Sequence, residues 1–279
     1  QHVVARRQSV VCLLFVSFDG GCGRGAKLAL EVDLERVEQL AEFRQMFDEA
    51  WRIQRDWFYD PGMHGVDWQA MHDKYAPFVA GCGSRDDLNY LIGEMIAEAY
   101  VRAGAKTYIS ARKADACDAT ASRLGELGTC ISLPADLSTG EGLQDLCEEL
   151  GKRESKLDIL VNNAGATWGA PIEEFPEHGW DKIMDINVKA PFFLTRQLLP
   201  LLQAAASPQD PARVINIGSI NGLSYSQLLN YSYSASKAAV HRLTSHMAAD
   251  LACDHINVNA IAPGFFPSKM TVHMLEEEE

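Results

Sequence analysis

The chain has 279 residues, of which 47% are hydrophobic and 23% are charged, so it can bury one large core or two smaller ones. Its 25 basic and 38 acidic side chains give a formal net charge of −13, which argues against nucleic acid or an anionic membrane as the main partner. Its seven cysteines form no Cys-x-x-Cys pair, so we expect no disulfide framework, no metal site and a reducing cytoplasm.

The first part of the chain is predicted to be helical after an opening strand. The apolar stretch over 10–18 is too short to span a bilayer and lacks the cleavage site of a signal peptide, so we expect a buried strand there. The spacing of aromatic and apolar side chains predicts a helix over 43–58. A short amphipathic helix is expected over 66–79, and a longer one over 88–102 that ends at Gly104.

From there onward, β-branched runs alternate with helical patterns. Such alternation predicts a parallel sheet with helices on both faces, which is the doubly wound, Rossmann-like α/β class. Ligands of such sheets bind at the carboxyl ends of the strands. The expected strands are Lys106–Ala111, Cys130–Pro134, Leu157–Asn162, Ala212–Ile217 and Ile256–Ile261, and the expected helices begin near Asp115, Thr139, Pro176 and Tyr231. We therefore divide the chain into a mainly helical N-terminal segment, 1–93, and an α/β domain, 94–279.

The most specific pattern in the chain is the pair Tyr233 and Lys237. Residues four apart project from the same face of a helix, and an ammonium a few Å from a phenol favours its phenolate form. Ser219 ends the strand that precedes this helix. Tyr231 has Ala235 four positions on and therefore no such cation, so we expect it to pack or to face solvent. A plain surface helix is the simpler interpretation, and the other strand ends decide against it.

Three strand ends and this helix carry Asn162-Asn-Ala-Gly165, Ser219, Tyr-x-x-x-Lys and Pro263-Gly264 in that order. With these motifs, residues 94–275 resemble the short-chain dehydrogenase/reductase family. In that family the tyrosine exchanges a proton with the substrate oxygen, the serine hydrogen-bonds that oxygen, the lysine binds the nicotinamide ribose, and an asparagine holds a proton-relay water. The resemblance places these roles on Tyr233, Ser219, Lys237 and Asn187.

The resemblance also implies a nicotinamide cofactor. A carboxylate after the strand 106–111 would accept the ribose hydroxyls of NAD, whereas Arg112 and Lys113 offer cations to a 2′-phosphate, so we expect NADPH. The alternative is that both cations are solvated loop residues. By resemblance, further cofactor contacts fall on Asp136, Leu137, Asn163, Ala164, Gly165, Pro263, Gly264, Phe266 and Ser268, together with Tyr233 and Lys237.

Two segments, 163–171 and 263–271, resemble the 3-oxoacyl-thioester reductase branch of the family. The implied reaction is reduction of a small-molecule carbonyl or an acyl thioester. The helices over 176–202 and 231–251 resemble those that pair across the family's dimer interface, so we expect a homo-oligomer by analogy.

The chain departs from the family at both flanks. The family's first strand ends in Thr-Gly-x-x-x-Gly-x-Gly, which binds the cofactor pyrophosphate. We find only weak substitutes for this loop, in residues 21–26 and 80–87. After Thr271 the chain stops before the closing helix and last strand that the family usually has. A scaffold that keeps the reductase shape without productive cofactor binding is therefore the alternative function.

Residues 27–95 resemble a different family, through the runs 42–68 and 84–93. They are similar to the helical entry segment of the core of tricorn-type serine peptidases. The catalytic residues of those peptidases lie beyond this segment, so no peptidase role carries over. The chain thus reads as a chimera with a junction near 92–100, as a natural fusion, a recombined library member or a computed sequence would each produce.

Overall fold

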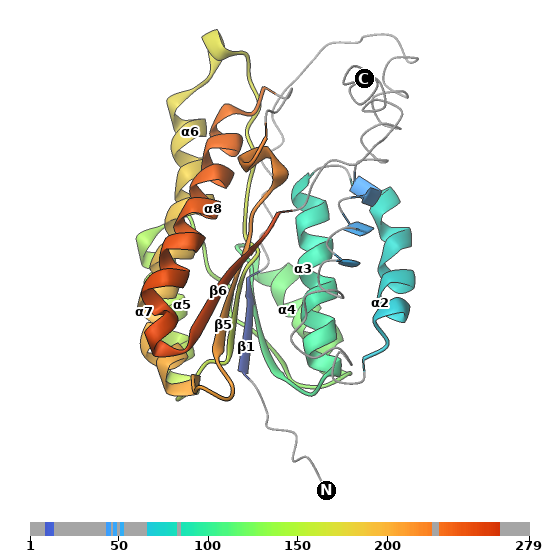
Figure 1. The fold of residues 1–279 in the computed structure, drawn as a ribbon. Helices are drawn as coiled ribbons and strands as arrows, with labels where there is room; N and C mark the ends of the chain where they lie inside the picture. Colours follow the sequence, from blue (N-terminus) through green and yellow to red (C-terminus); the bar gives the residue numbers. More distant parts are fainter. Residues whose placement is uncertain are drawn as a thin grey trace, which may run out of the picture.

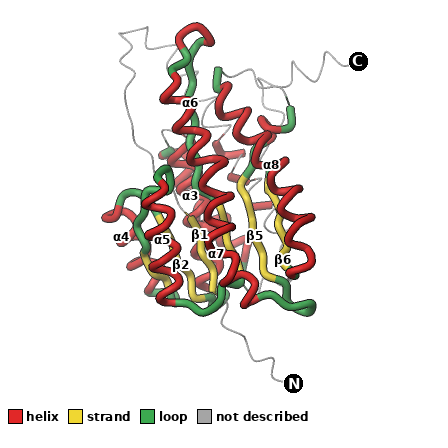
Figure 2. Tube along the Cα trace, turned by 90° about the vertical axis from the view of Figure 1, so that its left-hand side faces the viewer, coloured by secondary structure: helices red, strands yellow, loops and turns green. Residues whose placement is uncertain are grey.

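A six-stranded sheet with helices on both faces forms the centre of the molecule (Figures 1 and 2). The structure is a computed structural model that describes residues 9–13, 43–45, 47–48, 51–52, 66–82, 85–224 and 229–262, with only the backbone over 9–13 and 85–90. All neighbouring strands are parallel, in the order β3-β2-β1-β4-β5-β6. The strands are β1 Ser9–Leu13, β2 Lys106–Ser110, β3 Cys130–Ser132, β4 Ile159–Asn162, β5 Ala212–Ile217 and β6 Ile256–Ile261. The doubly wound α/β prediction is confirmed.

The helices form one layer on each face of the sheet, with α2, α3 and α4 on one side and α5 to α8 on the other (Figure 1). Their bounds are α2 Trp68–Tyr75, α3 Arg85–Arg102, α4 Ala114–Gly125, α5 Gly140–Arg153, α6 Glu177–Met184, α7 Ala190–Ala205 and α8 Tyr231–Leu251. Short helical turns cover Ala76–Gly81, Ile172–Glu174, Asp185–Lys189, Ile220–Gly222 and Ala252–Asp254. Among the helices that the structure describes, none combines the length and the apolar character that a membrane crossing requires.

The central strand of the sheet is β1, at the start of the chain. It pairs with β2 on one side, where Leu13 lies opposite Ser110, and with β4 on the other, where Cys12 lies opposite Val161. The sequence pattern assigns this strand to the N-terminal segment, whereas its backbone pairing places it in the α/β sheet. Residues 14–18 of the predicted strand lie outside the described part.

The connection from β1 to β2 passes through α3. This helix ends as predicted at Gly104, which has a positive φ of 83°, and Ala105 N–H closes the turn on Tyr100 O at 3.0 Å. The predicted boundary at residue 93 falls inside α3, and both halves of the chain continue through this one helix.

Side chains of the sheet alternate between two cores. Tyr108 and Leu160 pack under α5 to α8, whereas Ile109 and Ile159 pack under α3 and α4. Residues such as Phe47 of the N-terminal segment are buried in this second core as well. The segment that resembles a peptidase therefore covers one face of the reductase-like sheet.

Within the N-terminal segment, two tryptophans each donate an indole hydrogen bond to the other's backbone. The indole Nε1 of Trp51 donates to the carbonyl of Trp68 at 2.6 Å, and that of Trp68 donates to the carbonyl of Trp51 at 2.8 Å. His72 packs edge-on against Trp51, with 4.9 Å between ring centroids, and its Nε2 lies 2.7 Å from Asp48 Oδ1. This pairing satisfies both buried indole groups and fixes α2 beside the preceding helical residues.

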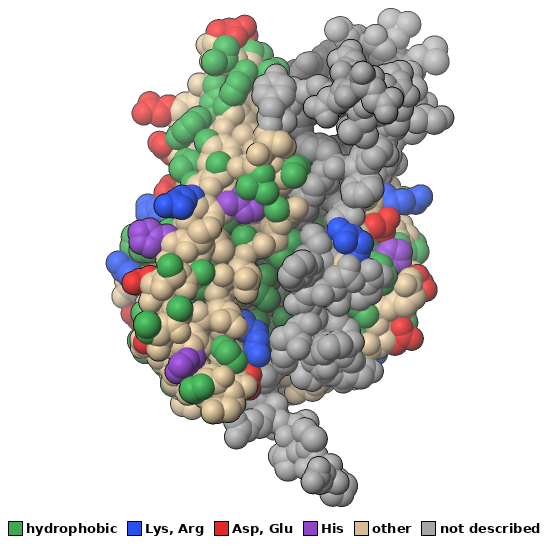
Figure 3. All heavy atoms as spheres, in the orientation of Figure 1, with side chains coloured by type: hydrophobic (Ala, Val, Ile, Leu, Met, Phe, Trp, Pro, Cys, Tyr) green, Lys and Arg blue, Asp and Glu red, His purple; other side chains and the backbone are tan. Residues whose placement is uncertain are grey.

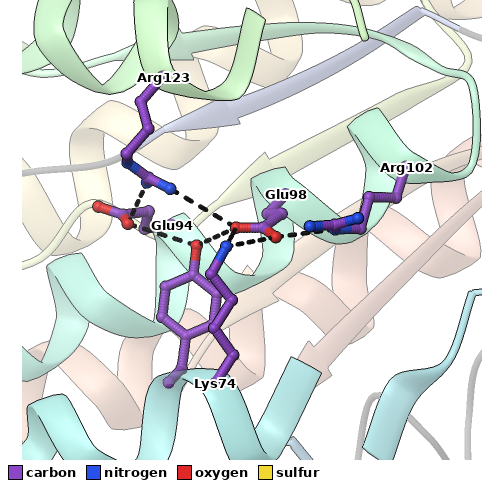
Figure 4. A network of polar contacts seen from close by, with 6 residues as sticks. Lys74, Glu94, Glu98, Arg102 and Arg123 are labelled. Carbon is purple, nitrogen blue, oxygen red and sulfur yellow. Dashed lines mark hydrogen bonds and ion pairs between the residues drawn. The ribbon is translucent and has the colours of Figure 1, made fainter. Parts of the chain in front are cut away.

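A buried carboxylate joins α2, α3 and α4 (Figure 4). Glu98 of α3 is fully buried, and Lys74 of α2 donates to both of its oxygens at 2.6 Å. Tyr75 donates to it at 2.5 Å and Arg102 at 2.8 Å, while Arg123 of α4 lies 3.6 Å away. Burial by itself would raise the pKa of Glu98, but the hydrogen bonds from Lys74, Tyr75 and Arg102 together hold that pKa below its ordinary value.

We predict that Glu98→Gln destabilises the fold by ~1.5–3 kcal/mol, because it removes the charge-assisted hydrogen bonds that Lys74 and Arg102 donate to a buried carboxylate. The measurement is urea unfolding of the variant and the parent chain. Since the folded pKa of Glu98 is lowered, its contribution is present above the unfolded pKa and is lost as the pH falls through the folded one. The difference between the two proteins should therefore shrink below pH ~4.3.

The matched control is Glu149→Gln, which removes an exposed carboxylate that also binds an arginine of its own helix. We expect little change in its unfolding midpoint, because exposed ion pairs are screened by solvent. Equal stabilities of Glu98→Gln and the parent at neutral pH would contradict the role given to this carboxylate.

Candidate active site

The candidate site lies at the carboxyl ends of β4 and β5, where α8 crosses them. A chain of side-chain hydrogen bonds, here called the relay, links these three elements. Asn162 Nδ2 donates to Asn216 Oδ1 at 2.8 Å, and Asn216 Nδ2 donates to the hydroxyl of Thr244 on α8 at 2.9 Å. All three side chains are buried, so the relay satisfies polar groups that would otherwise be costly and fixes the position of α8 against the strand ends.

Tyr233 and Lys237 both face this strand end from α8. Their exposed fractions are 6% and 5%. The Lys237 ammonium donates to the carbonyl of Ile217, the last residue of β5, at 2.7 Å, and it lies 5.5 Å from the centroid of the Tyr233 ring. The structure therefore brings the cation beside the phenol, as the spacing predicts, and holds it there through a backbone carbonyl.

Ser219 follows β5 directly and is also buried. Its Oγ accepts a hydrogen bond from the Asn221 N–H at 3.2 Å, which begins the short turn Ile220–Gly222. Its backbone faces the ring of His241, whose Nε2 lies 2.9 Å from Ser219 O and 3.3 Å from Ser219 N. The serine is thus held by its own turn on one side and by α8 on the other.

Two glycines allow this turn to lie flat against α8. A methyl group at Gly222 would come 2.4 Å from the backbone carbonyl carbon of Lys237, and one at Gly218 would come 2.4 Å from the ring of His241. Side chains at either position would therefore push Ser219 away from the helix that carries Tyr233.

Asn187 connects the Asn-Ala-Gly loop to α8. It lies in the π-helical turn Asp185–Lys189, a type of turn that is frequent at functional sites. Its Oδ1 accepts from Ala166 N, and its Nδ2 donates to Ala166 O and to Ser236 Oγ, all at 2.9 Å. Ser236 in turn donates to Tyr233 O at 2.7 Å. Both amide hydrogens are used in these bonds, so the side chain positions the loop rather than donating to a water.

Gly165 lies beside both Asn187 and Lys237. A methyl group there would lie 3.3 Å from Asn187 Oδ1 and 3.6 Å from Lys237 Nζ. The space beside the ammonium is therefore left open by a glycine, which suits a close approach of a flat ligand.

Most of the predicted cofactor residues fall into three groups. Arg112 is half-buried and Lys113 is exposed, and both directly follow the end of β2. Asn163 and Ala164 are buried beside Gly165. The remaining predictions at Pro263, Gly264, Phe266 and Ser268 lie outside the described residues.

Asp136 and Leu137 follow β3 in a tight turn. One carboxylate oxygen of Asp136 accepts from Ser138 N at 3.0 Å and from Ser138 Oγ at 2.6 Å, so it holds its own turn. Leu137 has an exposed fraction of 1%, and its side chain packs in the core under α5 to α8. The cofactor contacts expected at these two residues stay predictions.

The sequence did not single out His241. The available signal was its spacing, since 233, 237 and 241 are successive positions four apart on one helix. Within the described part of the chain, His, Cys, Asp and Glu side chains form no group of three or more that could hold a metal ion.

Two known protein families match this sequence, in the order of the two resemblances given above. The family described as short chain dehydrogenase matches residues 91–279, and the tricorn protease C1 domain matches residues 39–97. The two matches overlap inside α3.

Individual relatives agree with the first of these matches. The rhamnolipids biosynthesis 3-oxoacyl-(acyl-carrier-protein) reductase of Pseudomonas aeruginosa is 50% identical over 188 residues, which are 67% of this chain and 73% of that protein. Gluconate 5-dehydrogenase of Gluconobacter oxydans is 32% identical over 195 residues, covering 67% of this chain and 72% of the other. The solved Pseudomonas aeruginosa RhlG/NADP active-site complex has a TM-score of 0.60 at 50% identity and covers 66% of this chain and 72% of its own.

We predict that Gly222→Ala destabilises the protein by ~1–3 kcal/mol, because the added methyl overlaps the backbone of α8 at Lys237. Urea unfolding measures this change. The control is Gly151→Ala within α5, where an added methyl meets nothing within 4 Å and should stabilise the helix by ~0.5–1 kcal/mol. A Gly222→Ala variant as stable as the parent would show that the turn does not depend on this close approach.

Proposed function

Because this chain belongs to the short-chain dehydrogenase/reductase family, we propose that it is an oxidoreductase that reduces the carbonyl of a 3-oxoacyl thioester or a similar small molecule with NADPH. The observation that carries the proposal is the buried ammonium of Lys237 beside the ring of Tyr233, held at the end of β5. Ser219 lies two residues beyond that same strand end, which supports a role for its hydroxyl beside that of Tyr233.

In the proposed reaction the Tyr233 hydroxyl gives its proton to the substrate oxygen as that oxygen gains negative charge. The ammonium of Lys237 stabilises the phenolate left behind, and Ser219 Oγ donates a hydrogen bond to the same oxygen. The cofactor, when bound, supplies the hydride that the carbonyl carbon gains. The products are an alcohol and oxidised cofactor, and Tyr233 regains its proton from solvent.

The residues present suit a nicotinamide cofactor. Gly165 leaves open the space between Asn187 and Lys237 that a side chain would fill. Arg112 and Lys113 follow β2, where cations would pair with a 2′-phosphate. The NADP complex of the 50% identical protein supports the same choice.

The substrate class rests on the relative from Pseudomonas aeruginosa, which is a 3-oxoacyl reductase. The scaffold hypothesis predicts the opposite, a chain of the same shape that does not bind the cofactor productively. What motivates it is the length of chain between Leu13 of β1 and the first residue of α3, Arg85, where the family has a short glycine loop.

A homo-oligomer is proposed because apolar side chains remain exposed near α6 and α7. Figure 3 shows hydrophobic side chains over α6 with acidic ones at the margin. Ile172, Trp180 and Phe192 have exposed fractions of 72%, 40% and 38%. Such side chains near each other favour association with a second copy. We propose the cytoplasm as the site of action, in line with the free cysteines among the described residues.

The test of the reaction is Tyr233→Phe, which removes only the hydroxyl. We expect turnover of a 3-oxoacyl thioester to fall ~10²–10⁴-fold while NADPH binding, measured by calorimetry, is retained. The matched control is Tyr231→Phe, since Tyr231 is 38% exposed and contacts Phe175 at the surface. Equal turnover of Tyr233→Phe and the parent would contradict the role of Tyr233 as the acid. Absence of NADPH or NADH binding at millimolar concentration would favour the scaffold hypothesis.

Cofactor choice is tested by Arg112→Ala. If this guanidinium pairs with the 2′-phosphate, its loss should weaken NADPH binding by about tenfold or more, since a hydrogen bond to a charged group contributes ~1.5–3 kcal/mol. The dissociation constant for NADH should stay the same. The control is Arg153→Ala, an arginine at the end of α5 that pairs with Glu149 of the same helix. A parallel loss of NADH and NADPH affinity would contradict the proposed contact.

A further inference from the structure

One face of α8 carries three polar side chains at successive positions four apart: Tyr233, Lys237 and His241. Lys237 and His241 meet the chain at the end of β5, and Tyr233 lies beside Lys237. The Lys237 ammonium binds Ile217 O, and the ring of His241 meets the backbone of Ser219 two residues later. Because α8 is a continuous helix of 21 residues, a displacement of the strand end relative to one of these contacts also disturbs the others.

The contact at His241 is unusual because one ring nitrogen faces both backbone groups of the same residue. Nε2 lies 2.9 Å from Ser219 O and 3.3 Å from Ser219 N. A ring with its proton on Nε2 donates to the carbonyl, whereas a ring with its proton on Nδ1 accepts from the N–H. In either form the nitrogen binds the backbone of the residue that the proposed reaction uses as a hydrogen-bond donor.

The ring also sits tightly on the chain before the serine. A methyl at Gly218 would lie 2.4 Å from the Cε1 of His241 and 2.7 Å from its Nε2. The Gly218 N–H is in turn bonded to Ile261 O of β6 at 2.6 Å. The peptide before Ser219 is thus confined between β6 and the imidazole, and the glycine permits the approach.

We infer that His241 is a positioning residue for Ser219: it sets the place of the serine hydroxyl relative to Tyr233, and it acts through the Ser219 backbone without touching the substrate. The inference rests on the proposed reductase function. Its physical basis is that, among the described residues, the serine's own side chain is bonded within its short turn, through Asn221 N–H, so the turn as a whole needs a contact with α8 to hold its distance from Tyr233.

Two substitutions separate the hydrogen bond from the packing. His241→Phe keeps an aromatic ring against Gly218 but removes the nitrogen. His241→Gln removes the ring but places an amide near the position of Nε2, where it can either donate or accept. The control is His246→Phe, a substitution of an exposed histidine on the same helix.

We expect His241→Phe to lower kcat for the carbonyl substrate by ~10- to 100-fold, the range for a small misplacement of a catalytic group. The dissociation constant for NADPH and the unfolding midpoint should stay near those of the parent. His241→Gln should recover most of the lost kcat, and His246→Phe should have no effect. An unchanged kcat in His241→Phe would overturn the inference.

A double-mutant cycle distinguishes positioning of the serine from a general structural role. In a Ser219→Ala background the hydroxyl is absent, so His241→Phe should cause little further loss of kcat. The same fold-loss in both backgrounds would mean that His241 acts on something other than Ser219 and would overturn the inference.

A second readout does not depend on turnover. Amide hydrogen exchange over residues 218–223, followed by NMR, should become faster in His241→Phe and stay near the parent rate in His241→Gln, because either tautomer of the ring anchors this turn to α8. A parent chain without turnover would count against the proposed function alone, and the exchange rates would still decide the contact. Equal exchange in all three proteins would overturn it.

Discussion

The chemistry of this protein depends on how closely α8 lies against the end of β5. Lys237 reaches Ile217 O, and Thr244 reaches Asn216, so the helix is bonded to the strand at two levels along its length. The approach is close only because Gly218 and Gly222 carry no side chain. The bond to a backbone carbonyl holds the ammonium beside the ring of Tyr233, and a cation in that position favours the phenolate form of a phenol. The positions of Tyr233 and Ser219 follow from this one contact between helix and strand.

On the opposite face of the sheet, a segment that resembles another family packs against the strands. Apolar side chains from both parts fill one core there. Yet apolar packing tolerates several arrangements, whereas the buried Glu98 needs its three cations from α2, α3 and α4 at defined positions. The carboxylate therefore supplies the specificity with which α2 lies on α3. Tyr75 also bonds Glu98, and its pKa is raised by burial and by that hydrogen bond, so it remains a donor to the carboxylate.

Sequence patterns correctly predicted the features that depend on residues close together in the chain. β-branched runs became strands, Thr139 and Pro176 became the residues before α5 and α6, and Gly104 became the end of α3. The pairing of β1 was missed, because any apolar run of that length can join a sheet at several places and only the complete fold selects the partners. The motif around Leu137 indicates a backbone position, whereas packing decides that its side chain points into the core. His241 was missed because a single histidine on a helix has no pattern until the strand end lies beside it.

The parallel register of the sheet relates the connection after β1 to the strand ends that carry the candidate site. Leu13 lies opposite Ser110 and directly follows Cys12, which lies opposite Val161, so β1 ends level with Asn162, at the same edge of the sheet as the Asn-Ala-Gly loop. A right-handed crossover to β2 must then bring the first turn of α3 back to that edge, as in other doubly wound sheets, where dinucleotide phosphates bind. The proton-transfer groups belong to β5 and α8, whereas the phosphate edge belongs to the connection between β1 and α3. Because no residue is common to the two parts, a change in that connection can weaken cofactor binding while the Tyr233, Lys237 and Ser219 geometry persists.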